Sequence, residues 1–146
     1  MKHHLFSNNT KGLNFVAIGG GNGLSTLLSG LKRFVNAGDA EPIWLEDLSA
    51  IVAVTDDGGS SGRLRDELQM LPPGDIRNCM VAMSEASQTL SKLLRHRFRG
   101  DGDLGGHVFG NIFLAALSEI TGDFAEAVKL SSEILASKGH IYPATD

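Results

Sequence analysis

Two short apolar runs, each followed at once by a glycine-rich loop, limit the folds that this chain can adopt. The run 15–18 ends in the loop 19–23, and the run 48–55 ends in the loop 56–62. Both runs are rich in strand-forming residues, so we predict two buried strands. Apolar residues at three- and four-residue spacing predict a helix over 24–36 between them. Strand, helix and strand in this order predict a βαβ unit with parallel strands.

The glycine content supports a folded domain with several specialised loops. Glycine makes up 18 of 146 residues, about 12%, where soluble proteins average about 7%. Because parallel strands point the same way, both glycine-rich loops leave the predicted sheet at its carboxyl edge, where open α/β sheets bind ligands. We therefore expect an α/β fold with a ligand site at that edge.

The rest of the chain predicts four more helices and a further strand. We expect Asp75 to cap the first helix, Gly122 to close the third, and Asp123 to cap the fourth, which runs to about Ser137. The run Ile141-Tyr142 begins the further strand. The apolar stripes of the first three helices are Ile76, Cys79, Met80 and Met83; Leu90, Leu93, Leu94 and Phe98; and Ile112, Phe113, Ala116, Leu117 and Ile120.

Composition excludes several classes of protein. A content of 42% apolar and 21% charged residues excludes a disordered chain, and the length predicts one domain. The longest uncharged apolar runs fall far short of the 18 or so residues that a membrane span needs. The polar start has no signal-peptide core, and the single cysteine, Cys79, fits a reducing compartment. We therefore expect a cytoplasmic protein.

The charge balance predicts a small anionic partner rather than a nucleic acid. The formal net charge of −4 argues against a general nucleic-acid binder. The segment 63–99 nevertheless holds seven basic and four acidic residues, which suggests a local phosphate-bearing ligand. We interpret Arg95, Arg97 and Arg99 as basic residues that complement a helix C-terminus.

The first loop predicts a phosphate site. Gly20, Gly21, Asn22 and Gly23 precede a helix, so free backbone N–H groups and the positive helix end could hold a phosphate. The dinucleotide pattern GxGxxG fails because Leu24 stands in the place of its third glycine, and no Gly-Lys pair is present. The alternative is a tight strand-to-helix turn.

The second loop predicts polar chemistry at the second strand end. Asp56 and Asp57 could hold Mg²⁺, accept from a sugar hydroxyl or act as a base. Ser60, Ser61 and Arg63 could meet phosphate oxygens. In the alternative interpretation, Asp56 satisfies backbone amides in an Asx turn and 63–67 is a salt-bridged helix surface.

Two further helix starts carry candidate residues. Arg77 and Asn78 lie in the first turn of the helix that follows Gly74. His107 and Asn111 flank the start of another helix, after a third glycine-rich segment. For His107 a catalytic role stays open beside a structural one, because a lone histidine is more often a cap or a satisfied core residue.

The string 56–65, the string 72–78 and the set His107, Gly110 and Asn111 together resemble a known family. They are similar to the YvcK-type gluconeogenesis factors, bacterial members of the CofD-like group, which is named for 2-phospho-L-lactate transferase. Two positions depart from that pattern: Asn22 stands where relatives usually carry Thr, and Val108 replaces a Ser after the histidine.

The resemblance implies a three-layer, Rossmann-like CofD-type fold with a parallel sheet. Residues 15–146 would form the N-terminal part of a single domain, incomplete in this chain, behind a flexible segment 1–14. It also implies cytoplasmic location, a role in cell shape and growth on gluconeogenic carbon sources, and binding of a nucleotide sugar such as UDP-N-acetylglucosamine.

Our hypothesis is a regulator that binds a nucleotide sugar without turning it over. The loop 19–23 would take the diphosphate, Asp56 or Asp57 the sugar hydroxyls, and Ser60, Ser61 and Arg63 the remaining phosphate charge. One alternative is a Mg²⁺-dependent phosphotransferase of the 2-phospho-L-lactate transferase type, with Asp56 or Asp57 on the metal. Another is an NAD-type dinucleotide binder, which the failed GxGxxG pattern disfavours. A homo-oligomer is left open.

Overall fold

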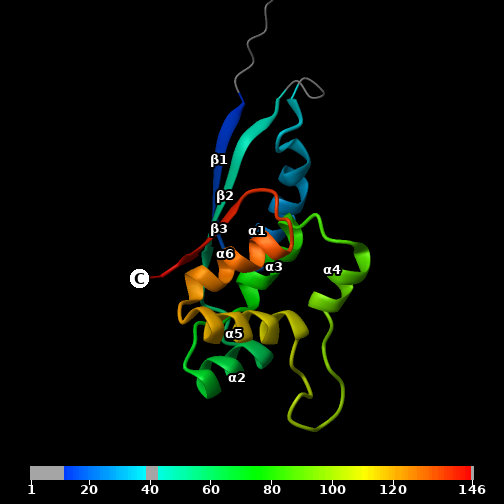
Figure 1. Cartoon of the computed structure of the whole chain (residues 1–146), viewed down its shortest axis with the longest axis vertical. Helices are drawn as coiled ribbons and strands as arrows, with labels where there is room; N and C mark the ends of the chain where they lie inside the picture. The colour runs from blue at the N-terminus through cyan, green and yellow to red at the C-terminus, as the bar shows by residue number, and fades with distance from the viewer. Residues whose placement is uncertain (1–11, 39–42, 146) are drawn as a thin grey trace, which may run out of the picture.

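A parallel three-stranded sheet organises the chain. The computed structural model describes residues 12–38 and 43–145, shown in Figure 1. Strands β1 (Leu13–Gly19), β2 (Leu45–Ala53) and β3 (His140–Ala144) pair in the order β1-β2-β3, and both pairings are parallel. The predicted βαβ unit and the late strand are confirmed. Residues 1–11 of the expected N-terminal segment lie outside the described residues, and Leu13 and Asn14 already belong to β1.

Within residues 12–38 and 43–145, six α-helices and a short 3-10 helix connect the strands. The helix expected over 24–36 begins earlier and ends earlier than predicted, with the 3-10 turn after it. Helix α2 was foreseen only within the alternative interpretation of 63–67. The elements are α1 (Gly21–Leu31), η1 (Lys32–Phe34), α2 (Gly59–Leu68), α3 (Gly74–Met83), α4 (Gln88–Leu94), α5 (Phe109–Thr121) and α6 (Phe124–Ile134).

The core lies between one face of the sheet and the helices that pack on it. Helices α1, α3 and α6 contact the strands, and the inward residues Ala17, Ala50 and Ile141 stand in register across β1, β2 and β3. The expected stripe of α3 is confirmed as core. Burial raises the pKa of the Cys79 thiol to about 12, so this side chain is a neutral part of the core.

The opposite face of the sheet is open in the described residues. Val16, Ile18 and Tyr142 are all exposed, and Ile18 keeps 75% of its surface accessible. The prediction that 15–18 forms a buried strand was therefore wrong in this respect. The described part supplies the sheet and a helical layer on one side of it, so only every second residue of β1 faces a helix.

Three predictions about helices need correction. Asp75 does not cap α3, because Pro73 is the N-cap and the helix already begins at Gly74. Helix α6 ends at Ile134 rather than near Ser137. The expected stripe of α5 was partly wrong: Ile120 is 76% exposed, because α5 packs on its neighbours through the face that includes Leu114.

Two predicted caps are confirmed. Gly122 ends α5 in the left-handed conformation, with φ of 72°. The Asp123 carboxylate caps α6 by accepting from the Glu126 backbone N–H at 2.8 Å. No helix of the described ranges has both the length and the apolar character needed to cross a membrane.

The two faces of the sheet should respond differently to truncation. Leu48→Ala should lower the free energy of unfolding by about 2–5 kcal/mol, because Leu48 is fully buried and its loss leaves a cavity. The matched variant Ile18→Ala, in the neighbouring strand, should change it by less than about 0.5 kcal/mol. Urea denaturation measures both. Equal losses would contradict the assignment of the inner face.

Candidate functional site

Four of the described helices begin without a capping side chain, and these are the helices whose starts carry the candidate residues predicted from the sequence. The N-caps of α1, α2, α3 and α5 are Gly20, Gly58, Pro73 and Val108, and none of the four contributes a side-chain cap. By contrast, side chains cap α4 and α6. An uncapped N-terminus leaves backbone N–H donors and a partial positive charge available for an anion. At α5, however, the N–H groups of Val108 and Phe109 already donate to the Ser60 hydroxyl and to the His96 carbonyl, so this applies to α1, α2 and α3.

These four helix starts lie in one row. A Cβ placed on Gly20 would stand 3.0 Å from an Asp75 carboxylate oxygen, so α1 begins beside the first turn of α3. A Cβ on Gly74 would overlap the Asp56 carboxylate and the Ser61 hydroxyl, so α3 begins against α2. The row continues because the α5 cap donates from its backbone N–H to the Ser60 hydroxyl at 3.1 Å. The fold thus brings both glycine-rich loops to one edge.

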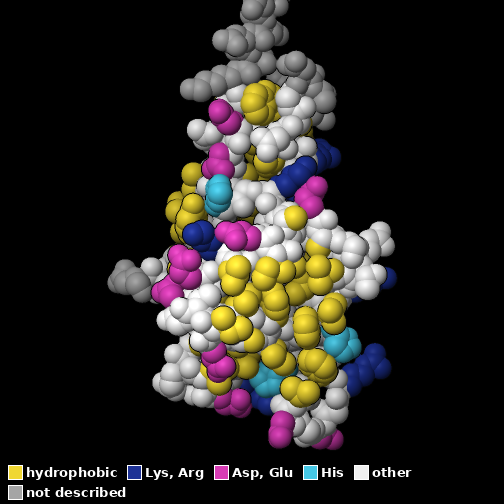
Figure 2. Space-filling model, viewed as in Figure 1, with side chains coloured by type: hydrophobic (Ala, Val, Ile, Leu, Met, Phe, Trp, Pro, Cys, Tyr) yellow, Lys and Arg dark blue, Asp and Glu magenta, His cyan; other side chains and the backbone are white. Residues whose placement is uncertain are grey.

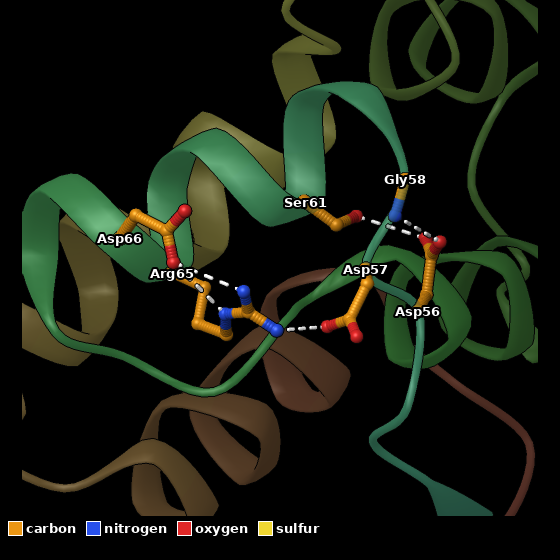
Figure 3. Close-up of polar contacts among 6 residues, drawn as sticks. All are labelled: Asp56, Asp57, Gly58, Ser61, Arg65 and Asp66. Atoms are coloured by element: carbon orange, nitrogen blue, oxygen red, sulfur yellow. Dashed lines mark hydrogen bonds and ion pairs between the residues drawn. The ribbon is translucent and has the colours of Figure 1, made fainter.

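The Asp56 carboxylate accepts hydrogen bonds from groups of the second glycine-rich loop itself. One carboxylate oxygen accepts from the Gly58 backbone N–H at 3.1 Å, and the other accepts from the Ser61 hydroxyl at 2.9 Å (Figure 3). The first bond is an Asx turn, as the alternative interpretation expected. Both oxygens of Asp56 are therefore engaged in shaping the start of α2.

Asp57 points away from Asp56. Its carboxylate pairs with the Arg65 guanidinium, which also contacts Asp66, and Asp57 remains 68% exposed (Figure 3). These carboxylates raise the pKa of Arg65, Asp66 most strongly. The carboxylates of Asp56 and Asp57 diverge, and the Mg²⁺ role predicted for one or the other stays a prediction. Within the described residues no group of three or more His, Cys, Asp or Glu side chains could hold a metal.

A buried polar network joins the starts of α2 and α5. The Asn111 amide nitrogen donates to the hydroxyls of Ser60 and Ser61, at 3.1 Å and 3.2 Å. Ser60 also lies 3.2 Å from Nδ1 of His107. Ser60, Ser61, His107 and Asn111 are all buried, so these four predicted residues are brought together behind the loop. Asn111 is 2% exposed, and its carbonyl oxygen has no partner among the described residues.

The network requires neutral His107. The Ser60 oxygen already accepts two hydrogen bonds from N–H groups, so we assign the Ser60 hydroxyl as the donor to Nδ1 of His107. Nδ1 then carries no proton and acts as the acceptor. Burial, with the nearby positive charge of Arg63, lowers the pKa of His107. We interpret His107 as a structural member of the network, one of the two roles that the sequence left open.

Arg63 holds the segment 100–106 in place. Its guanidinium donates to the backbone carbonyls of Gly105 and Asp103, at 2.7 Å and 2.8 Å. The positive charge is exposed, but its donors are directed at this loop rather than at the first glycine-rich loop. The phosphate role predicted for Arg63 therefore stays a prediction.

Arg97 is the candidate that the sequence missed. Its Nη1 lies 3.9 Å from the position that a Cβ would take on Gly59, at the start of α2, and donates to the Gly106 carbonyl at 2.6 Å. We had interpreted Arg97 as a complement to a helix C-terminus. Arg97 instead forms an isolated antiparallel β-bridge with Val108, and this pairing places Arg97 near the start of α2. Its position in the basic segment was the only signal in the sequence.

Arg77 lies close to Arg97. Burial lowers the pKa of Arg77, and the positive charge of Arg97 adds to that shift. The side-chain stem packs on Gly110, and one terminal nitrogen donates to the Asn78 amide oxygen at 2.7 Å. Its Nε is buried without a partner among the described residues. The Asp56 and Asp75 carboxylates act on Arg77 in the opposite sense and raise its pKa, so Arg77 lies among charges of both signs.

The first loop is open to solvent. Gly21 begins α1 with φ of 62°, a conformation that favours glycine. The Asn22 and Gly23 positions are exposed, and the Asn22 backbone carbonyl accepts from the hydroxyl of Thr26 at 2.7 Å. The surface hollows lined by α6 with β3, and by α2 with α5 and α6, contain none of the predicted site residues.

This fold and this site define an α/β protein whose parallel sheet presents several uncapped helix N-termini at one edge. A family model described as "2-phospho-L-lactate transferase CofD" matches residues 15–146. The chain therefore belongs to the CofD family, as the sequence resemblance implied.

Relatives and solved structures agree with this assignment. Proteins named "Gluconeogenesis factor" from Halalkalibacterium halodurans and Bacillus subtilis are 48% and 49% identical, over 91% and 88% of this chain and 38% and 37% of their own lengths. A crystal structure of a Bacillus halodurans protein matches with a TM-score of 0.82 at 48% identity, over 92% of this chain and 40% of that one. The chain spans 27% to 41% of the first curated relatives.

The neutral network predicts a pH dependence of stability. The pKa of His107 is lower in the folded chain than in the unfolded chain. As the pH falls below about 6.5, the unfolded chain therefore binds a proton at His107 that the folded chain does not bind. The free energy of unfolding should therefore fall between pH 7 and pH 5. His107→Asn should flatten this fall, whereas His96→Asn, at an exposed histidine, should keep it. Denaturant titrations at each pH measure the slopes, and identical slopes in all three proteins would contradict the prediction.

Proposed function

We propose that this protein binds a phosphate-bearing nucleotide sugar, of the UDP-N-acetylglucosamine kind, at the row of helix starts. The observation that supports this most directly is the meeting of the uncapped N-termini of α1, α2 and α3 near Arg77 and Arg97. Backbone N–H donors at helix starts favour anions, and arginines recognise phosphate with several donors at once.

The two arginines favour a ligand with negative charge. Arg77 and Arg97 repel each other, and Arg77 is also partly desolvated. Since arginine stays protonated at neutral pH, this arrangement costs free energy until an anion approaches. A phosphate at the start of α2 would offset both effects.

We expect the two glycine-rich loops to bind different phosphates of the ligand. The N–H groups of Gly20, Gly21, Asn22 and Gly23 would hold one phosphate, since the glycines allow close backbone approach. The start of α2, with Arg97, would hold the second. Asp57 is exposed at the same edge and could accept from a ribose or sugar hydroxyl after leaving Arg65.

A regulatory role without turnover agrees best with this arrangement. The two candidate carboxylates diverge, and Asp56 is used internally. Relatives that share nearly half of the residues carry the name gluconeogenesis factor. We therefore propose a cytoplasmic role in growth on gluconeogenic carbon sources and in cell shape, carried out with the rest of the longer protein.

Arg97→Ala should weaken binding of UDP-N-acetylglucosamine at least about tenfold, because charge-assisted bonds to phosphate contribute about 1.5–3 kcal/mol. Arg99→Ala removes the same charge two residues away and serves as the matched control. Isothermal titration calorimetry measures both affinities. The proposed subsite is wrong if the two variants bind as tightly as the wild type.

The same titrations separate the alternative functions. UMP and UDP test whether the diphosphate is needed, and NAD tests the dinucleotide alternative. Incubation with Mg²⁺ and a phosphodiester donor, followed by mass spectrometry, tests for transfer. A transferred product would replace the regulatory proposal by the phosphotransferase alternative, while the anion site itself would stand.

A further inference from the structure

Basic side chains surround a surface hollow between α1, α3 and α4. The hollow has a volume of about 370 Å³, and Lys32, Lys92 and Arg95 lie around it. Val81 and Ala82, near the end of α3, are buried and line its inner side. None of the described residues that line it is acidic. We call this site the α4 hollow.

The three positive charges of the α4 hollow are only partly offset by their surroundings. The nearby carboxylate of Glu85 pairs with Lys138 instead, at 3.6 Å. Helices α1, α3 and α4 end beside the hollow, and each helix end carries about half a negative charge. Three full positive charges exceed these partial charges, although the chain as a whole has a formal net charge of −4.

The same separation of charge is visible on the surface. Most of the Lys and Arg side chains in Figure 2 lie on the right of the molecule, the side on which Figure 1 places α4. Most Asp and Glu side chains in this view lie on the left or at the lower end. An anion that approaches the side of α4 therefore meets mainly positive charge.

The basic side chains also have free hydrogen-bond donors. Lys32 donates from Nζ to the Ser84 carbonyl at 2.7 Å, which leaves two of its three N–H groups available. Within residues 12–38 and 43–145, the Lys92 ammonium and the Arg95 guanidinium have no hydrogen-bond or ion-pair partner. Arg95 is the C-cap of α4, but a complement to one helix end does not require three cations from different elements around one hollow.

We infer that the α4 hollow binds a small phosphate-bearing anion, with its phosphate group between Lys32, Lys92 and Arg95. A phosphate monoester carries up to two negative charges on three acceptor oxygens, which suits two lysine point charges and one arginine fork. A carboxylate would bring only one charge. Gln88 and Ser91, which also line the hollow, would contact the group that carries the phosphate.

The α4 hollow is separate from the row of helix starts. Helix α1 begins at Gly21, and Ser29, which lines the hollow, follows eight residues later, about 12 Å along the helix. None of the site residues predicted from the sequence lines the hollow. The inference therefore does not depend on the proposed nucleotide sugar.

Two-dimensional ¹H–¹⁵N NMR of the full 146-residue chain, titrated with sodium phosphate at pH 7.5 and constant ionic strength, tests this inference. The amide resonances of Ser91 and Lys92 should shift and saturate, with a millimolar dissociation constant. Glycerol 3-phosphate should shift the same resonances. Phosphate bound at the helix starts would instead shift the amides of Gly20 and Gly58, so the two sites are read separately.

Charge removal tests which residues hold the anion. Lys92→Ala combined with Arg95→Ala should raise the dissociation constant at least about tenfold, because charge-assisted bonds to phosphate are lost. Lys129→Ala combined with Arg99→Ala removes the same charge outside the hollow and is the matched control. Circular dichroism shows whether each variant keeps its fold.

Three results would overturn the inference. The first is the absence of saturable shifts at Ser91 and Lys92 up to about 50 mM phosphate. The second is an equal loss of affinity in the control variant, which would indicate only a general effect of net charge. The third is a stronger response of these resonances to a tetraglutamate peptide than to phosphate, which would assign the hollow to an acidic peptide.

Discussion

The Asn111 amide is the interaction on which the site depends. Its two N–H bonds reach the hydroxyls of Ser60 and Ser61, which are adjacent in the first turn of α2. Ser61 then donates to Asp56, which holds the Gly58 amide, so a single side chain on α5 determines the shape of a loop 50 residues earlier in the chain. A buried network of this kind is stable only when its members are paired, which explains why neutral His107 belongs to it.

Close backbone approach is the second constraint. Gly74 leaves no room for a Cβ against Asp56 and Ser61, and Gly110 leaves none against Arg77. These contacts bring α3 beside α2 and α5 beside α3, so that helix starts from distant parts of the chain meet at one edge. The partial charges of the helix ends then add to those of Arg77 and Arg97. The Asp56 carboxylate at the start of α3 and the Asp75 carboxylate beside Gly20 offset part of this positive charge.

Much of the architecture followed from local patterns. The βαβ unit, the late parallel strand, the core stripe of α3 and the caps at Gly122 and Asp123 depend on residues near one another in the sequence, and each was confirmed. The cap expected at Asp75 and the end of α6 were wrong by a few residues, and the other predictions that failed concern what lies against an element. The outward side of β1 and the side of α5 that carries Ile120 are apolar, and hydrophobic periodicity alone cannot say whether a partner covers such a surface.

The sequence by itself determined the fold class, the family and the edge of the sheet at which the candidate site lies, because strand order and glycine-rich turns are encoded locally. Only the tertiary structure decided the roles of individual side chains. It directed Ser60, Ser61 and Asp56 inward and Arg63 toward a neighbouring loop, and it brought Arg97 to the start of α2. The physical reason is that hydrogen bonds and charge pairs depend on distances of a few ångströms between residues far apart in the chain.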